Sequence, residues 1–257
     1  MATRPKLSFL PAATQALFKR LAAEPLMEEL VLVGGSALAL QIGHRRSEDL
    51  DFALLGPKLP AARINALIAA LETEGREVSL MTAQSDIERF RINTGRKLLD
   101  YVRDYAVDGA KLTFFARGAN APKAQIDFLA RFAKAYTKTA FAIMGLDGLF
   151  AMKTLVLAER ARSRDLFDLM VLIHDHGCQI KDCFHLLQTL APAEARDIER
   201  HKAVMTGAIA LDAEDEGFES LELKTDIAEV YAFFAGEVNR YERDTARETL
   251  HAAKHGK

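Results

Sequence analysis

The sequence predicts an α+β fold in two parts, a head over residues 1–130 that combines a mixed sheet with helices, and a helical C-terminal part over residues 131–257. Two observations carry this prediction. Strand and helix patterns follow one another as far as Gly75, short β-rich segments continue to Phe115, and the pattern beyond Phe128 is helical nearly to the end. The two parts are expected to join near residues 129–140.

The head opens with a predicted helix, in which Ala16, Leu17, Leu21 and Ala22 share one face. The run LVLV that ends at Val33 predicts a buried strand, and GGSALALQIG predicts a turn followed by a short apolar helix. After HRRSE, the alternating DLDFALL predicts a second strand. The segment PKLPAARINALIAALETEG then has the start and stop signals of a helix that ends at its final glycine.

Residues 77–115 predict a meander of short strands, with VSLMTA, ERFRIN, LLDYVRDYAV and KLTFFA as its segments. The pair Asp108-Gly109 lies between two apolar runs and predicts a tight hairpin. Further along, helices are expected over Leu146–Ala161, Arg164–His174 and Thr225–Glu242, and the acidic DAEDEGFE at 212–219 is expected to be a loop.

The composition is that of an ordinary soluble globular protein, with 49% hydrophobic and 27% charged residues. The formal net charge of −2 gives no overall basic excess of the kind that marks many nucleic-acid binders. Three local basic clusters are either phosphate contacts or solvated surface; they are Arg45 with Arg46, Arg96 with Lys97, and the trio Arg160, Arg162 and Arg164.

Cysteine content and hydropathy predict a cytoplasmic protein. The two cysteines, Cys178 and Cys183, do not indicate a disulfide framework, and the segment MATRPKLSFLPAATQ does not have the pattern of a signal peptide. No apolar run approaches the length that spans a bilayer. We therefore expect no membrane insertion.

Asp49 and Asp51 are candidate metal ligands. They stand two apart in a predicted strand, so both side chains leave one face while Leu50 and Phe52 point into the core. Mg²⁺, or Mn²⁺ in its place, is held by such oxygen ligands, usually one or two carboxylates together with substrate phosphates. Transfer of a nucleotidyl group commonly uses divalent metals in this way.

Gly34, Gly35 and Ser36 follow the first predicted strand and open a helix. Backbone N–H groups and the positive end of the helix then converge on a spot suited to phosphate, and the glycines allow the chain to approach it closely. The alternative for Ser36 is a helix N-cap. Either motif alone is common, but the ordered series of strand, Gly-Gly-Ser, helix and acid-apolar-acid strand is much more specific.

This ordered series resembles the polymerase-β nucleotidyltransferase superfamily. GGSALALQIGHRRSEDLDF further resembles the AbiEii/AbiGii toxin-type family, which includes the MenT-like toxins and whose signature runs through a Gly-Gly-Ser/Thr turn, His-Arg, a Ser and Asp-x-Asp-Phe. DYAVDGAKLTFF and LDGLFAMKTLVLAERARSRDLFDLMVLI are similar to later blocks of that family. The resemblance covers roughly residues 30–175, in the same order.

The resemblance implies a site for a nucleoside triphosphate (NTP) substrate. The head acids bind metal, and Lys153 with Asp165 or Asp168 completes the catalytic set. The implied nucleotide-binding residues are Gly34, Gly35, Ser36, Arg45, Ser47, Lys153, Arg160 and Arg164. On a continuous helix, the spacing of Lys153, Arg160 and Arg164 would line one face. The alternative is a set of ordinary ion pairs on a helix surface.

The sequence departs from the superfamily by lacking a third carboxylate in the hairpin strand LTFF. Asp108 and Asp127 are the nearest acids, and the pattern places neither of them well. Either the two carboxylates Asp49 and Asp51 suffice for the metal site, or the chain has lost some of its nucleotidyltransferase activity. His44 is a candidate substrate contact or a structural hydrogen-bonding residue.

A zinc site is a further possibility, with His174, His176 and Cys178 as its candidate ligands. Alternate helix positions do not face each other, and a fourth ligand is missing unless Cys183 or His185 loops back. A polar helix end is the simpler interpretation.

The resemblance implies transfer of a nucleoside monophosphate (NMP) from an NTP to RNA, such as a tRNA 3′ end, by the toxin of a type IV-like toxin–antitoxin or phage-defence system with a cognate antitoxin. Modification of a protein hydroxyl is a second possibility. A catalytically inactive module that binds a nucleotide or partner is a third, although the intact Ser36, Asp49, Asp51 and Lys153 argue against it.

Overall fold

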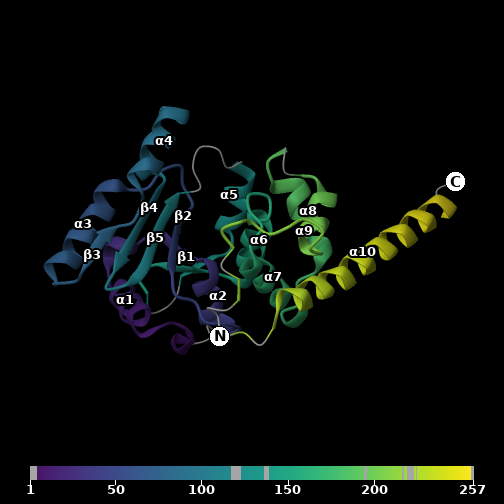
Figure 1. Ribbon diagram of the computed structural model, residues 1–257, viewed down its shortest axis with the longest axis horizontal. Coiled ribbons are helices and arrows are strands. Elements are labelled where there is room, and N and C mark those ends of the chain that lie inside the picture. Colours follow the sequence, from purple (N-terminus) through teal and green to yellow (C-terminus); the bar gives the residue numbers. More distant parts are fainter. Residues whose placement is uncertain are drawn as a thin grey trace. The chain divides into compact units, whose positions relative to one another are not determined.

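The computed structural model of the protein describes residues 5–116, 123–135, 139–193, 196–215, 217–218, 223 and 225–255. The chain divides into two compact units, residues 1–149 and residues 150–257 (Figure 1). The first unit ends later than the predicted boundary at residue 130, because two short strands after that point join the sheet.

The first unit contains every described strand. Its elements in chain order are η1 (Leu7–Phe9), α1 (Ala12–Ala22), η2 (Pro25–Met27), β1 (Leu30–Val33), α2 (Gly34–Ile42), β2 (Leu50–Leu54), α3 (Ala61–Thr73), β3 (Val78–Leu80), α4 (Gln84–Thr94), η3 (Leu98–Asp100), β4 (Val102–Val107), β5 (Ala110–Ala116), α5 (Lys123–Ala130), β6 (Ala133–Ala135) and β7 (Ala142–Met144).

The described strands form one mixed sheet in the order β3-β4-β5-β2-β1-β7-β6. The adjacent strands β1 and β2 are antiparallel, while β2 with β5 and β1 with β7 are parallel. The head is therefore the predicted α+β structure with a mixed sheet. The predicted strands at LVLV and DLDFALL and the helix that stops before Gly75 are all present.

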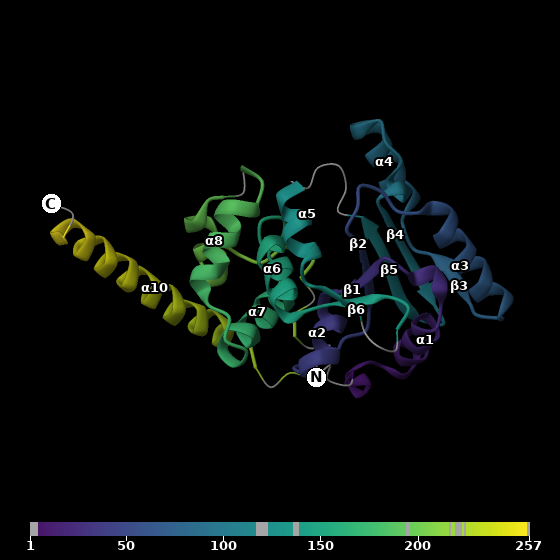
Figure 2. The ribbon, with the colours of Figure 1, turned by 180° about the vertical axis from the view of Figure 1, so that it is seen from behind.

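Aromatic residues fill one face of this sheet. The ring of Phe52 on β2 lies 6.0 Å from that of Phe114 on β5 and 4.8 Å from that of Phe141, which in turn meets Phe18 of α1 at 5.6 Å. Both α1 and α3 cover this face (Figures 1 and 2). Residues that alternate with Phe52 along β2, including Asp51, therefore emerge on the opposite face.

The predicted hairpin at Asp108-Gly109 is confirmed. Both residues have positive φ, 49° and 81°, as a primed two-residue turn requires, and Val107 pairs with Ala110 across it. Asp108 also accepts hydrogen bonds from the backbone N–H of Glu77 at 2.9 Å and from Arg76 Nη1 at 2.8 Å.

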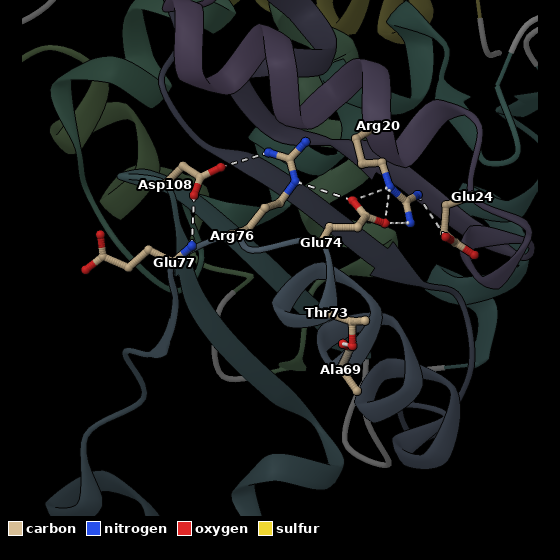
Figure 3. A network of polar contacts seen from close by, with 8 residues as sticks. All are labelled: Arg20, Glu24, Ala69, Thr73, Glu74, Arg76, Glu77 and Asp108. Carbon is tan, nitrogen blue, oxygen red and sulfur yellow. Dashed lines mark hydrogen bonds and ion pairs between the residues drawn. The ribbon is translucent and has the colours of Figure 1, made fainter.

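An ion-pair network continues from this turn to the first helix (Figure 3). Arg76 Nε lies 3.7 Å from Glu74 Oε2, and Arg20 on α1 binds the same carboxylate with Nε–O distances of 2.8 and 2.9 Å. Arg20 also pairs with Glu24 at 2.8 Å. The hydrogen bond from Arg20 lowers the pKa of the Glu74 carboxyl. The network links α1, the end of α3 and the β4–β5 turn.

Within the first unit, the sequence-based description was wrong in two places. The segment ERFRIN belongs to α4 and not to a meander strand: Gln84 and Glu88 pair one helical turn apart, and Gly95 ends the helix with a φ of 69°. The region after Phe128 also contains β6 and β7, which extend the sheet beside β1. Their short apolar segments do not have a period long enough to distinguish strand from helix.

The second unit is helical in its described residues. Its helices are α6 (Leu146–Val156, which begins in the first unit), α7 (Ser163–Asp175), α8 (Ile180–Leu190), α9 (Ile198–Met205) and α10 (Ile227–His255). The predicted helix over Leu146–Ala161 ends early, at Val156, and α10 continues beyond the predicted Glu242, away from α7, α8 and α9 (Figures 1 and 2). Within the described part of the chain, no helix has the length and apolar character needed to cross a membrane.

We expect Phe52→Ala to destabilise the protein by about 3–5 kcal/mol, because the fully buried ring leaves a cavity between Phe114 and Phe141. The measurement is urea unfolding followed by circular dichroism. Ile92→Ala is the matched control, since Ile92 is 78% exposed and its loss should change the free energy of unfolding by less than about 0.5 kcal/mol. Equal effects of the two substitutions would contradict this description of the core.

Candidate active site

The turn from β1 into α2 lies directly against the carboxylate of Asp51. Val33 pairs with Asp51 in the sheet, and Gly34 follows with a φ of 72°. A Cβ atom on Gly34 would stand 2.5 Å from Asp51 Oδ2, well inside contact distance. Only glycine allows the backbone at the start of α2 and the carboxylate to approach each other this closely.

The second glycine of the turn makes room for a buried arginine. A Cβ atom on Gly35 would lie 2.6 Å from Arg45 Nη2 and 3.0 Å from Ser47 Oγ. Arg45 is 7% exposed, and its Nη1 donates to the main-chain oxygen of Arg46 at 3.0 Å. A guanidinium is thus packed over the first turn of α2, where its charge adds to the positive helix end.

Ser36 joins α2 to the segment that carries the acids. Its side chain is fully buried, and its Oγ hydrogen bonds with Ser47 Oγ at 2.9 Å and with the main-chain oxygen of Asp49. The structure shows no capping hydrogen bond from the side chain at the helix start, where Val33 is the N-cap residue. Ser36 is therefore not the N-cap that the sequence left open, and its hydroxyl holds Asp49 in place.

Asp49 and Asp51 are both partly exposed, whereas Leu50 and Phe52 are fully buried. The burial alternates over these four residues as predicted, but β2 begins only at Leu50. Asp51 therefore lies within the strand, on the face opposite the aromatic core, and Asp49 immediately precedes the strand. Two carboxylates beside a side-chain-free glycine and a helix N-terminus form a donor set that fits a hard divalent cation such as Mg²⁺ together with phosphate oxygens.

The described residues contain no group of three His, Cys, Asp or Glu side chains placed to hold one metal ion. The two acids that the sequence suggested as a third carboxylate lie elsewhere: Asp108 binds Arg76 in the hairpin turn, and Asp127 on α5 pairs with Lys123 at 2.5 Å. The strand register instead places Thr113 on β5 beside Asp51, and Asp104 on β4 beside Thr113. The sequence pattern had singled out neither Thr113 nor Asp104. The hairpin turn fixes the second pairing and could have revealed it.

Lys153 of the second unit lies between two buried carboxylates. Its Nζ is 2.5 Å from Asp165 Oδ1 and 2.8 Å from Asp168 Oδ2, and Arg160 Nε lies 3.0 Å from Asp165 Oδ2. Lys153 is 7% exposed and Asp168 fully buried. Both acids that the resemblance offered therefore contact the lysine.

Burial of the Asp165 carboxyl raises its pKa, but the Lys153 ammonium and the Arg160 guanidinium act in the opposite sense. Their attraction prevails, so the pKa of Asp165 lies below its usual value. The carboxylate form is thus the one that the folded unit stabilises.

The expected single helix face through Lys153, Arg160 and Arg164 was wrong. The chain leaves α6 at Val156, and α7 begins only at Ser163, so Arg160 reaches Asp165 from a turn. The sequence between the helices contains no glycine or proline that would have signalled this break.

The acidic segment 212–219 is confirmed as a loop in its described residues, and it contacts the start of α7. Asp215 Oδ1 accepts from both the backbone N–H and the hydroxyl of Ser163 at 2.9 Å, at the start of α7, and Asp212 Oδ2 accepts from the N–H of Ala161 at 3.0 Å. Glu216 and Glu219 lie outside the described residues.

His174, His176 and Cys178 do not form a zinc site in the described structure. His174 Nδ1 lies 2.6 Å from the neighbouring Asp175 Oδ1 at an exposed position. Cys183 is fully buried beside Thr154, and burial raises the pKa of its thiol to about 12, which disfavours the thiolate that zinc requires.

Comparisons with known proteins identify the family of the chain. A family model described as nucleotidyl transferase AbiEii toxin, type IV TA system, matches residues 15–253. Among curated proteins, the uncharacterized protein aq_aa25 of Aquifex aeolicus (strain VF5) is 25% identical over 213 residues, which cover 83% of this chain and 88% of that protein.

Two solved structures are also similar. A candidate nucleotidyltransferase from H. pylori has a TM-score of 0.48 and 20% identity, and the match covers 91% of this chain and 94% of that one. MenT4, a nucleotidyltransferase toxin from Mycobacterium tuberculosis H37Rv, has a TM-score of 0.43 and 14% identity, with 88% and 86% covered.

We expect Asp165→Asn to destabilise the protein by about 3–5 kcal/mol at pH 7, because it leaves the buried Lys153 less well compensated. The folded-state pKa of Asp165 is depressed, so its contribution is fully present above the unfolded value of about 3.9 and is lost as pH falls through the folded value. The difference in unfolding free energy between wild type and variant should therefore be constant from pH 8 to 5 and shrink below about pH 4.

The measurement is urea unfolding at each pH. Asp175→Asn serves as the control, because Asp175 is an exposed acid and its replacement should have little effect at any of these pH values. A difference for Asp165→Asn that persists undiminished at pH 3 would show that its ionised form is not the stabilising one.

Proposed function

The chain belongs to the nucleotidyltransferase AbiEii toxin family, and from that premise we propose that it is a metal-dependent enzyme that transfers an NMP from an NTP to an acceptor hydroxyl. The observation that carries this proposal is the contact between the carboxylate of Asp51 and Gly34 at the start of α2. A site for phosphate and a site for a divalent cation then lie side by side, as this reaction needs.

The reaction is an in-line displacement at the α-phosphorus. The acceptor oxygen forms a bond to phosphorus, the bond from phosphorus to the β-phosphate oxygen breaks, pyrophosphate leaves, and the acceptor proton passes to solvent. The protein takes little part in the covalent chemistry of such a transfer. It positions the two reactants and neutralises the charge on the phosphates.

The first turn of α2 is suited to the phosphates. The N–H groups of a first helical turn have no partner within the helix, and together with the positive helix end they favour an anion. Gly34 and Gly35 place no side chain at this turn. The buried guanidinium of Arg45 beside Gly35 supplies a full positive charge next to this turn. Ser36 acts on the site through Asp49, whose main-chain oxygen it binds, and Ser47 completes that link.

Asp49 and Asp51 are the residues that would hold the divalent cation, Mg²⁺ or Mn²⁺. When bound, such an ion neutralises charge on the triphosphate and polarises the phosphoryl oxygen. Ser36 binds the backbone at Asp49, directly before β2, and the pairing of Val33 with Asp51 fixes the strand itself, so the backbone at each carboxylate is held by a hydrogen bond or a strand pairing.

The family resemblance also assigns Lys153 and a partner acid to the reaction. We propose that Asp165 and Asp168 together orient the Lys153 ammonium, since both contact it within the second unit. Arg160 and Arg164 remain predicted nucleotide contacts.

We propose RNA, such as a tRNA 3′ end, as the acceptor and a cognate antitoxin as the partner, in a type IV-like toxin–antitoxin system that could serve phage defence. The support is the family, whose model describes toxins of type IV systems. Transfer to a protein hydroxyl is the competing outcome of the assay below.

We expect Asp51→Asn to abolish transfer while the protein stays folded, because the substitution removes a metal-binding charge at nearly constant volume. The loss should exceed the roughly 10–100-fold that removal of a supporting group around a metal typically costs. The measurement incubates wild type and variant with Mg²⁺ and each labelled NTP, with total RNA and then with total protein.

Label should move to RNA with the wild type and not with Asp51→Asn. Asp86→Asn on the exposed helix α4 is the matched control and should retain wild-type turnover. Wild-type turnover by Asp51→Asn would remove this residue from the mechanism, and label in the protein fraction alone would replace RNA as the acceptor.

A second prediction compares two glycines that both have positive φ. Gly34→Ala and Gly75→Ala each place a side chain in the left-handed region, at a cost of about 1–2 kcal/mol. At Gly75 the new Cβ meets nothing within 4 Å, whereas at Gly34 it meets the Asp51 carboxylate. We expect transfer to fall about a hundredfold in Gly34→Ala alone, since a displacement near 1 Å in an active site costs that much.

The measurements are thermal unfolding and the same transfer assay for both variants. Gly34→Ala should be destabilised at least as much as Gly75→Ala, and it alone should lose activity. If Gly34→Ala transferred label as well as Gly75→Ala, the close approach of Asp51 to the turn would have no part in catalysis.

A further inference from the structure

Three polar side chains stand in one row across the central strands. Asp51 on β2 pairs with Thr113 on β5, and Thr113 pairs with Asp104 on β4. Directly paired residues project from the same face of a sheet, with Cβ atoms about 4.5–5.5 Å apart in antiparallel pairs. Thr113 and Asp104 therefore lie on the same face as Asp51, opposite the aromatic core.

The hydrogen bond within this row orients the threonine. Thr113 Oγ1 donates to Asp104 Oδ1 at 2.7 Å. A hydroxyl has one proton and two acceptor lone pairs, and a carboxylate only accepts. Because the proton of Thr113 points to Asp104, the lone pairs of Oγ1 are available on the other sides, which include the side of Asp51.

Asp104 is itself held firmly in place. Its backbone N–H donates to Thr82 Oγ1 at 3.0 Å, and its main-chain oxygen accepts from the N–H of Met81 at 2.7 Å. Thr113 is 9% exposed, in the strand between the two acids. The hydroxyl is thus a preorganised neutral oxygen donor and not a mobile surface group.

We propose that Thr113 Oγ1 is a further oxygen ligand of the divalent cation held by Asp49 and Asp51, and that Asp104 is the positioning residue that orients it. The inference rests on the proposed function, since it extends the same cation site. A neutral third donor adds an oxygen to the set without placing a third carboxylate on the cation. Hard cations accept such mixed sets of carboxylate and neutral oxygens.

The competing explanation is that Thr113 and Asp104 form a cross-strand pair that only stabilises the hairpin. A structural pair and a metal ligand differ in one measurable property, the affinity of the protein for the cation without nucleotide. We therefore choose Mn²⁺ as the probe and titrate it into the full-length protein, with free Mn²⁺ followed by electron paramagnetic resonance.

Thr113→Val removes the hydroxyl at nearly constant shape and should weaken Mn²⁺ binding about 10–100-fold, whereas Thr113→Ser retains the hydroxyl and should bind nearly as wild type does. Asp104→Ala removes the orienting acceptor and should weaken binding about tenfold. Thr73→Val is the matched control: its hydroxyl donates to Ala69 within α3 (Figure 3), and its loss should leave Mn²⁺ affinity unchanged.

Circular dichroism checks that each variant is folded, and Asp104→Ala provides the test if Thr113→Val is not. Wild-type affinity in folded Thr113→Val or Asp104→Ala, with weakened binding in Asp51→Asn, would overturn this inference and leave the proposed function standing. Wild-type affinity in Asp51→Asn as well would overturn the cation site itself, and with it both proposals.

Discussion

The pairing of Val33 with Asp51 across β1 and β2 is the constraint on which the rest of the first unit depends. It brings the last residue of a buried strand level with a carboxylate, so the chain can enter α2 only through a residue without a side chain, which is Gly34. Strand, helix start and acid are thereby fixed to one another by backbone hydrogen bonds. A candidate site built on such elements is more rigid than one built on loops, and rigidity is what positioning catalysis requires.

Charged side chains differ between the two units in how far they are buried and in what they contact. In the first, Asp49 and Asp51 remain partly exposed beside a positive helix end, an arrangement open to an added cation and anion. In the second, Lys153 and Asp168 are buried and form an ion pair with each other. A buried cluster of this kind adds little net stability but makes loss of any one member costly. The lysine is therefore held in a defined position whatever its role in the reaction.

Distant contacts also protect the register of the central strands. The network from Arg20 through Glu74 and Arg76 holds the Asp108 turn, which in turn sets the pairing of β4 with β5 (Figure 3). A slip of one residue in that pairing would move Asp104 to the opposite face of the sheet. Exposed ion pairs contribute little free energy individually, but here several of them meet at the one turn from which the register is counted.

The sequence by itself determined the local elements of the head, the facing of Asp49 and Asp51, and the primed turn at Asp108-Gly109, because each depends on periodicity or turn chemistry within a few residues. From that turn the pairing of Asp104 with Thr113 could have been counted. Only the tertiary structure decided that β5 lies beside β2, and thus that Thr113 neighbours Asp51. It also decided that Ser36 binds the main-chain oxygen of Asp49. In the second unit, it decided that Asp165 forms ion pairs with both Lys153 and Arg160. These contacts join segments whose local patterns are independent of each other, and they form because burying polar groups requires that each find a partner.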